Sequence, residues 1–244
     1  MKYSLIAVAF LIATLIPVPS HTTHKDGLFM TGPDTKAGSV DAKAPAVKHK
    51  FAKIVFATEV SEESVNQAID FMEKSKADVE FVVIELNTPG GSVPDGFRLG
   101  KVIEEYGKPV HCIVDGEAHS MGFYLLQPCS TRTMTKRATL MAHEPSLGGR
   151  MYGNQHYFQD VANILATLSS AMAEHEAARL CITSDAFKKG IDNQAWWMDW
   201  HEAARIGATD YIATSVPAYL ESLGATGTLP KDLLSPLNSL EFCP

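Results

Sequence analysis

Residues 79–122 read VEFVVIELNTPGGSVPDGFRLGKVIEEYGKPVHCIVDGEAHSMG and decide the fold. Within this stretch, residues 79–86 and 110–114 are short apolar runs, the pattern of strands that are buried on both faces. Residues 95–106 lie between the two runs and repeat apolar side chains at helical spacing. The stretch therefore predicts a strand, a right-handed crossover helix and a second, parallel strand.

The same alternation continues on both sides of this stretch. Residues 54–60 predict a strand and residues 61–74 predict a helix with one apolar face. Towards the C-terminus, residues 155–179 predict a long helix and residues 200–206 a short one. We expect one α/β domain over residues 51–225, a mostly parallel sheet with crossover helices and a long helix that protrudes.

The two ends of the chain have a different composition. Residues 1–20, MKYSLIAVAFLIATLIPVPS, have the layout of a secretory signal peptide, cleaved near Ser20. Their apolar run would span roughly 18 Å as a helix, short of the ~30 Å hydrocarbon core, although an uncleaved anchor is the alternative. Residues 21–50 predict a flexible linker and residues 226–244 a C-terminal tail. We expect a periplasmic or secreted protein with no stable membrane span after cleavage.

Charge and cysteine content exclude several classes of protein. The formal net charge is −7, which disfavours binding to nucleic acid or to an anionic membrane surface. The four cysteines lack the paired CxxC spacing of a zinc site and are too sparse for a disulfide scaffold. The four cysteines are Cys112, Cys129, Cys181 and Cys243. In a compartment that oxidises thiols some of them would pair, but the sequence does not say which ones. No metal or organic cofactor is expected.

Three segments with chemical potential lie where predicted strands end, the edge at which α/β proteins bind ligands. Residues 87–93 hold Pro-Gly-Gly, whose backbone N–H groups can point into a site, although the same tripeptide is a common turn. Residues 116–122 place Ser120 at a strand-to-helix junction, where a serine either caps the helix or presents its hydroxyl beside backbone N–H groups. Residues 141–145 hold His143, either an interior histidine or a base for that hydroxyl.

Taken together and in this order, the three segments resemble the Clp protease proteolytic subunit family, within the wider ClpP/crotonase fold superfamily. The resemblance runs from about residue 54 to residue 212 and implies a ClpP-like fold. It implies that Ser120 is the nucleophile, that His143 is the general base, and that the N–H groups of Gly91 and Met121 form the oxyanion hole. It also implies a self-assembling ring, with the predicted helix over residues 155–179 as the contact between rings.

The sequence departs from the family pattern at two places. The family has a small residue before the nucleophile, whereas this chain has His119, which we do not assign as the base because adjacent side chains diverge. The family's third catalytic residue is an aspartate, which counting forward from His143 places at Asp192. Counting back from the C-terminal helix lands on Ala195 instead. We expect Asp192 to orient His143, with Asn193 in reserve, and a pair without an acid as the remaining alternative.

The leading hypothesis is a serine-type peptidase that hydrolyses peptides or unfolded protein segments outside the cytoplasm through Ser120, His143 and Asp192, without an ATPase partner. One alternative is a catalytically inactive ClpP-like binding or assembly module. A crotonase-like acyl-CoA enzyme is a less favoured alternative, since such a site needs no Ser–His pair. A Ser–Lys pair, as in signal-peptide-peptidase-type enzymes, would require a lysine near Met172, and there is none; Lys136 is the nearest candidate.

Overall fold

The computed structural model describes residues 28–31 and 49–226. In this part of the chain the strands form one sheet in the order β1-β2-β3-β4-β5-β8, and β6 and β7 extend it from β4. Five of its strand pairs are parallel, whereas β1–β2 and β6–β7 are antiparallel. The predicted α/β class with a mostly parallel sheet is confirmed. The strands are β1 (Leu28–Thr31), β2 (Phe51–Phe56), β3 (Phe81–Thr88), β4 (Val110–His119), β5 (Thr131–Thr135), β6 (Thr139–Ala142), β7 (Trp196–Met198) and β8 (Tyr211–Ala213).

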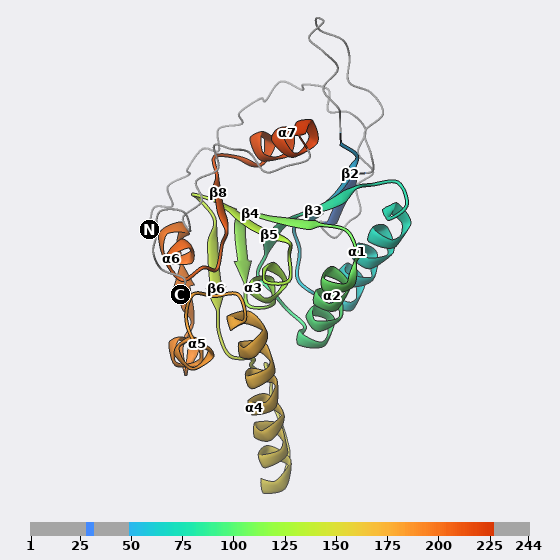
Figure 1. Cartoon of the computed structure of the whole chain (residues 1–244). Helices are drawn as coiled ribbons and strands as arrows, with labels where there is room; N and C mark the ends of the chain where they lie inside the picture. Colours follow the sequence, from blue (N-terminus) through green and yellow to red (C-terminus); the bar gives the residue numbers. More distant parts are fainter. Residues whose placement is uncertain (1–27, 32–48, 227–244) are drawn as a thin grey trace, which may run out of the picture.

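Helices cover both faces of the sheet. Figure 1 shows α7 on one side of the sheet and α1, α2 and α3 on the other, while α4 projects away from the body. The apolar core is divided in the same way, into a large cluster beneath α1 to α3 and a small one beneath α7. The helices are α1 (Glu62–Ser75), α2 (Val93–Glu105), α3 (Met121–Leu126), α4 (Gln155–Ala177), α5 (Ser184–Ile191), α6 (Trp200–Arg205) and α7 (Val216–Thr226).

Strand β3 explains why the deciding stretch is apolar without alternation. Ile84 and Leu86 point into the large cluster, whereas Phe81 and Val83 point into the small one. Successive side chains of a strand face opposite sides, so a strand buried on both faces needs apolar residues at every position.

Strand β4 changes partners along its length, and this positions the candidate site. It pairs with β5 over residues 111–114 and with β6 over residues 117–119. Its register with β3 shifts between Leu86 and Thr88, an irregularity that re-aims a strand. Ser120 therefore follows the end of β4 beside β6 rather than beside β5.

The N-terminal prediction needs a correction at β1. This strand lies inside residues 21–50, which the sequence predicts as a flexible linker, and it pairs with β2 through the backbone, as an antiparallel edge strand. Composition does not reveal such pairing, because an edge strand can be held by backbone hydrogen bonds alone. The predicted signal peptide and most of the predicted tail lie outside the described residues. No helix in the described part of the chain is long and apolar enough to cross a membrane.

The root of α4 buries an acid. Only the last turns of this helix have buried residues, and Glu176 among them is 1% exposed. No described residue forms a hydrogen bond with its Oε2 atom. Burial therefore raises the pKa of the Glu176 carboxyl well above its usual value.

We predict that Glu176 makes the fold less stable as pH rises. The pKa of the Glu176 carboxyl is higher in the folded protein than in the unfolded chain. Its contribution to the free energy of unfolding is therefore fully present below the unfolded pKa and is lost as pH rises through the folded pKa. Glu176→Gln stays neutral and should raise the free energy of unfolding by about 1–3 kcal/mol at about pH 8, with little change at about pH 4. Urea unfolding of both proteins at the two pH values measures this difference, and an equal pH dependence in both would contradict it.

Candidate active site

Ser120 occupies a sharp turn between β4 and α3. Its φ of 54° lies in the left-handed region, which is costly for a residue other than glycine and persists where the surroundings hold it. Its N–H donates to the Met141 carbonyl at 2.8 Å, and its own carbonyl accepts from the N–H groups of Phe123 and Tyr124. The serine stands at the N-cap position of α3, yet its side chain makes no capping hydrogen bond. The simple capping explanation is therefore not what the structure shows.

The hydroxyl instead meets the imidazole of His143. His143 Nε2 lies 2.7 Å from Ser120 Oγ, and both residues are half-buried. His143 follows β6, which runs parallel to β4 with Met141 opposite His119, so the two strands end at the same edge of the sheet. This distance suits transfer of the hydroxyl proton to a neutral imidazole.

The Pro-Gly-Gly loop packs directly against this turn. Gly90 has a φ of +96°, and a Cβ atom at this position would lie 2.6–2.9 Å from the His119 carbonyl, the Ser120 Cβ and the Met121 nitrogen. Among the described residues, the N–H groups of Gly91 and Met121 donate none of the loop and turn hydrogen bonds. Met121 follows Ser120 directly and Gly91 follows the glycine that packs against the Ser120 turn, so two backbone donors without such a partner in the described chain lie on the segments that meet at this turn, as an oxyanion hole requires.

We predict that Gly90→Ala lowers kcat/KM by about 10²-fold, because the added methyl group must displace the Ser120 turn by a fraction of an ångström or more. Gly107→Ala is the matched control: Gly107 also has a positive φ, of +79°, but a Cβ there meets nothing within 4 Å. The control should lose about 1 kcal/mol of stability and keep its activity. Steady-state hydrolysis and thermal unfolding of both variants decide the matter, and equal activity losses would argue against a specific role for the close packing.

The structure does not bring the predicted acid to the histidine. Asp192 is the C-cap of α5, and its Oδ1 atom accepts a hydrogen bond from Asn193 Nδ2 at 2.7 Å. The Asn193 N–H donates to Glu144 Oε2. In the described part of the chain, neither Asp192 nor Asn193 forms a hydrogen bond or ion pair with His143, so the expected contact is absent.

The register of β6 and β7 explains which residue takes that place. In this antiparallel pair Met141 lies opposite Trp197 and Ala142 opposite Trp196. The same register, continued by one residue, sets Ala195 opposite His143. Of the two ways of counting along this loop, the one that lands on alanine therefore agrees with the strand pairing.

Sequence reasoning missed Glu144. Its two carboxylate oxygens accept hydrogen bonds from Ser169 Oγ of α4 at 3.2 Å and from the Asn193 N–H at 3.3 Å. Glu144 directly follows His143, so these two hydrogen bonds connect α4 and the loop after α5 to the segment that holds the histidine. Its position inside the histidine motif was the available signal.

Two other side chains with possible catalytic roles point elsewhere. His119 places Nδ1 3.0 Å from Glu117 Oε2 and Nε2 2.9 Å from Thr139 Oγ1, and its ring packs edge-on against Trp197. Burial lowers its pKa, and the neighbouring Glu117 opposes that shift in part. The Lys136 ammonium lies over the Trp200 ring. Neither contact involves Ser120, which fits the assignment of His143 rather than His119 or Lys136 as the base.

The described residues contain no cluster of three or more His, Cys, Asp or Glu side chains that could hold a metal ion. The sequence also holds three histidines before the predicted domain, at positions 21, 24 and 49. His49 pairs with Glu80, and that hydrogen bond is the main cause that lowers the pKa of the Glu80 carboxyl. His21 and His24 lie outside the described residues.

Comparisons with known proteins and with family models agree on one family. The chain is 30% identical over 169 residues to the ATP-dependent Clp protease proteolytic subunit 1 of Chlamydia muridarum, covering 67% of this chain and 86% of the relative. It is 29% identical over the same length and coverage to the subunit of the same name from Chlamydia trachomatis, and 28% identical over 137 residues, 55% of this chain and 66% of the relative, to that from Protochlamydia amoebophila. A family model described as Clp protease matches residues 44–216. The chain therefore belongs to the Clp protease family.

Proposed function

We propose that the protein is a serine peptidase in which Ser120 is the nucleophile and His143 the general base. The observation that carries the proposal is the 2.7 Å contact between Ser120 Oγ and His143 Nε2. Membership of the Clp protease family supports peptide bonds as the bonds that are cut.

In the proposed reaction, Ser120 Oγ attacks the peptide carbonyl while His143 Nε2 takes the hydroxyl proton. The N–H groups of Gly91 and Met121 stabilise the negative oxygen of the tetrahedral intermediate. His143 then gives its proton to the leaving amine, which leaves an acyl group on Ser120. A water molecule, deprotonated by His143, attacks this ester, releases the acid and restores the hydroxyl.

The proposed catalytic group is a pair rather than a triad. The β6–β7 register, continued by one residue beyond Ala142 and Trp196, supports this, because it gives Ala195 and not an acid the place opposite His143. An acid in that position fixes the tautomer of the imidazole and stabilises its charged form, and its loss costs about 10⁴ in rate in a serine protease. We therefore expect slow turnover of short peptides or unfolded segments, and the proposal includes no ATPase partner.

The proposal also places the protein outside the cytoplasm. It is supported by the disulfide between Cys112 and Cys129 and by Cys181, which is disulfide-bonded as well, since such bonds persist in oxidising compartments. The signal-peptide-like composition of residues 1–20 agrees with it.

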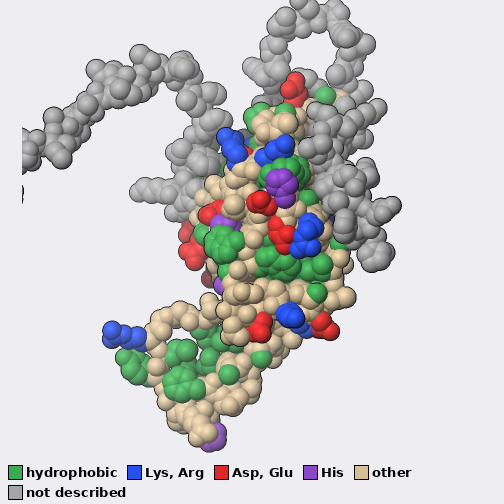
Figure 2. Space-filling view, turned by 90° about the vertical axis from the view of Figure 1, so that its left-hand side faces the viewer, with side chains coloured by type: hydrophobic (Ala, Val, Ile, Leu, Met, Phe, Trp, Pro, Cys, Tyr) green, Lys and Arg blue, Asp and Glu red, His purple; other side chains and the backbone are tan. Residues whose placement is uncertain are grey.

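We further propose that copies of the chain associate through α4. Exposed apolar side chains gather on this helix and on the loop before it, and the projecting part in Figure 2 shows them as a green cluster. Monomers rarely leave such a cluster uncovered. The residues of this exposed cluster are Leu147, Met151, Tyr152, Tyr157, Phe158 and Ile164. Analytical ultracentrifugation tests the association.

Hydrolysis of blocked fluorogenic peptides and of unfolded casein tests the proposed activity. The expected result is slow cleavage by the native protein and none by Ser120→Ala, with both proteins folded and of the same oligomeric size. A catalytically inactive assembly module is the second candidate, and the alanine at position 195 is the observation in its favour. Absence of cleavage by a folded, assembled native protein would decide for the module.

A further inference from the structure

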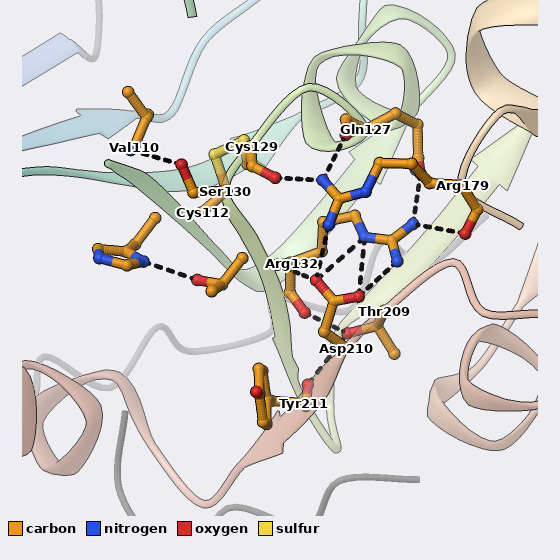
Figure 3. Close-up of polar contacts among 12 residues, drawn as sticks. Val110, Cys112, Gln127, Cys129, Ser130, Arg132, Arg179, Thr209, Asp210 and Tyr211 are labelled. Atoms are coloured by element: carbon orange, nitrogen blue, oxygen red, sulfur yellow. Dashed lines mark hydrogen bonds and ion pairs between the residues drawn. A yellow bond between two sulfur atoms is a disulfide. The ribbon is translucent and has the colours of Figure 1, made fainter. Parts of the chain in front are cut away.

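A disulfide closes a covalent loop of the chain that contains the candidate nucleophile, Ser120. Cys112 lies within β4 and Cys129 follows α3, with Cα atoms 5.8 Å apart and a sequence separation of 17 residues. Both side chains are fully buried. Figure 3 shows the bond beside a group of polar contacts that converge on the end of α3.

We call residues 112–129 the nucleophile segment. It consists of most of β4, the turn at Ser120, and α3. Ser120 stands near its middle, eight residues after Cys112 (120 − 112) and nine before Cys129 (129 − 120). The left-handed φ of Ser120 is costly, so the turn needs its two arms held in place. The disulfide joins the two arms at their ends farthest along the chain from Ser120.

Polar contacts hold the far end of the same segment. The Arg179 guanidinium donates to the backbone carbonyls of Gln127 and Cys129. Arg132, only 3% exposed, donates to Gln127 Oε1 and to the Asp210 carboxylate. Asp210 also accepts from Arg179, and Figure 3 shows both guanidinium groups directed at this carboxylate. These contacts anchor the segment's end to β5 and to the residues before β8. Ser130, which follows Cys129, also exchanges hydrogen bonds with Val110 at the start of β4, so the disulfide adds a covalent link beside a backbone contact.

We propose that the Cys112–Cys129 disulfide is a covalent staple that holds the two arms of the nucleophile segment together and so positions Ser120. The functional part of the inference rests on the proposed peptidase activity. The bond forms by thiol–disulfide exchange: the two thiols are oxidised to the disulfide, and a donor disulfide, of an oxidoreductase or of glutathione, is reduced to two thiols. Because both sulfur atoms are buried, the bond closes as the chain folds, and reductants do not reach it in the native protein.

The test compares the native protein with Cys112→Ala/Cys129→Ala, both prepared under oxidising conditions so that the disulfide of Cys181 is kept. Peptide mapping without reductant should find residues 112 and 129 cross-linked in the native protein. Hydrogen exchange of amides 113–128 should be at least about tenfold faster in the variant, whereas α1 (Glu62–Ser75) should exchange as before. The melting temperature should fall by about 6–12 °C, as expected for a closed loop of this length.

A second comparison separates the lost bond from the lost sulfur atoms. The native sequence, refolded and kept in a thiol reductant, retains both cysteine side chains but lacks the bond. The reductant opens the disulfide of Cys181 as well, so Cys112→Ala/Cys129→Ala in the same reductant is the reference. The reduced native protein should show the same faster exchange of amides 113–128, and unfolding in urea followed by refolding with oxidised glutathione should restore slow exchange. For peptide hydrolysis at a temperature where thermal unfolding shows both forms to be folded, kcat should fall at least about tenfold in both bond-free forms while KM changes little.

Two results would overturn the staple: absence of the cross-linked peptide from the oxidised native protein, or equal exchange of amides 113–128 with and without the bond. Hydrogen exchange does not depend on catalysis, so it also separates the two proposals. A native protein that cuts no peptide but shows the exchange difference would refute the peptidase and leave the staple in place.

Discussion

His143→Ala is expected to lower kcat/KM for peptide hydrolysis by about 10²-fold, because no other described side chain forms a hydrogen bond with Ser120 Oγ and a pair without an acid has less rate to lose than a full triad. Without the imidazole, the hydroxyl must lose its proton to water during the attack. Binding of the peptide does not need this contact, so the loss should appear in kcat rather than in KM.

The double variant Ser120→Ala/His143→Ala is the sharper part of this experiment. Residues that act as one unit give losses that do not add, so the double variant should be about as inactive as either single one. His119→Ala serves as the control, since His119 contacts Glu117 and Thr139 and not the hydroxyl. A larger loss for His119→Ala than for His143→Ala would show that His119, and not His143, is the base.

Ala195→Asp is expected to raise kcat/KM, by about 10–10³-fold, and is the second large effect. The β6–β7 register, continued by one residue, sets position 195 opposite His143, and we expect a carboxylate there to accept a hydrogen bond from the second imidazole nitrogen. A nearby negative charge also stabilises the protonated imidazole, so the acidic limb of the pH–rate profile should move to higher pH.

Ala195→Asn is the matched control, since it has the same shape without the charge and should give little or none of the gain. Asp192→Asn completes the set, because the Asp192 carboxylate contacts Asn193 in the structure. If Asp192→Asn lost about 10⁴ in kcat/KM while Ala195→Asp gained nothing, Asp192 would be the orienting acid and our placement of that position would be wrong.

Local patterns predicted those elements whose identity does not depend on distant partners. Strand β3 and helices α1, α2 and α4 lie within a few residues of their predicted ranges, since apolar periodicity sets them directly. β7 is different. Its three residues become a strand through pairing with β6, which a single sequence does not display. The same holds for β1 within the predicted linker.

The residues of the candidate site also divide into those that the sequence predicts and those that depend on pairing between strands. Ser120 and His143 each follow a strand of one parallel sheet, so topology alone places them at the same edge. The acid position depends on the register of an antiparallel pair, and a one-residue ambiguity there decides between an aspartate and an alanine. The partner of Cys112 was left open for a related reason, since a disulfide depends on a distance between Cα atoms that spacing along the chain does not give.

Labelling with a fluorophosphonate probe tests the central claim most directly, because the probe reacts with a hydroxyl that a neighbouring base has activated. Peptide mapping of the labelled native protein should find one adduct, on Ser120, while folded Ser120→Ala should take up none and His143→Ala very little. A folded native protein that stays unlabelled, or an adduct on a different serine, would contradict the account.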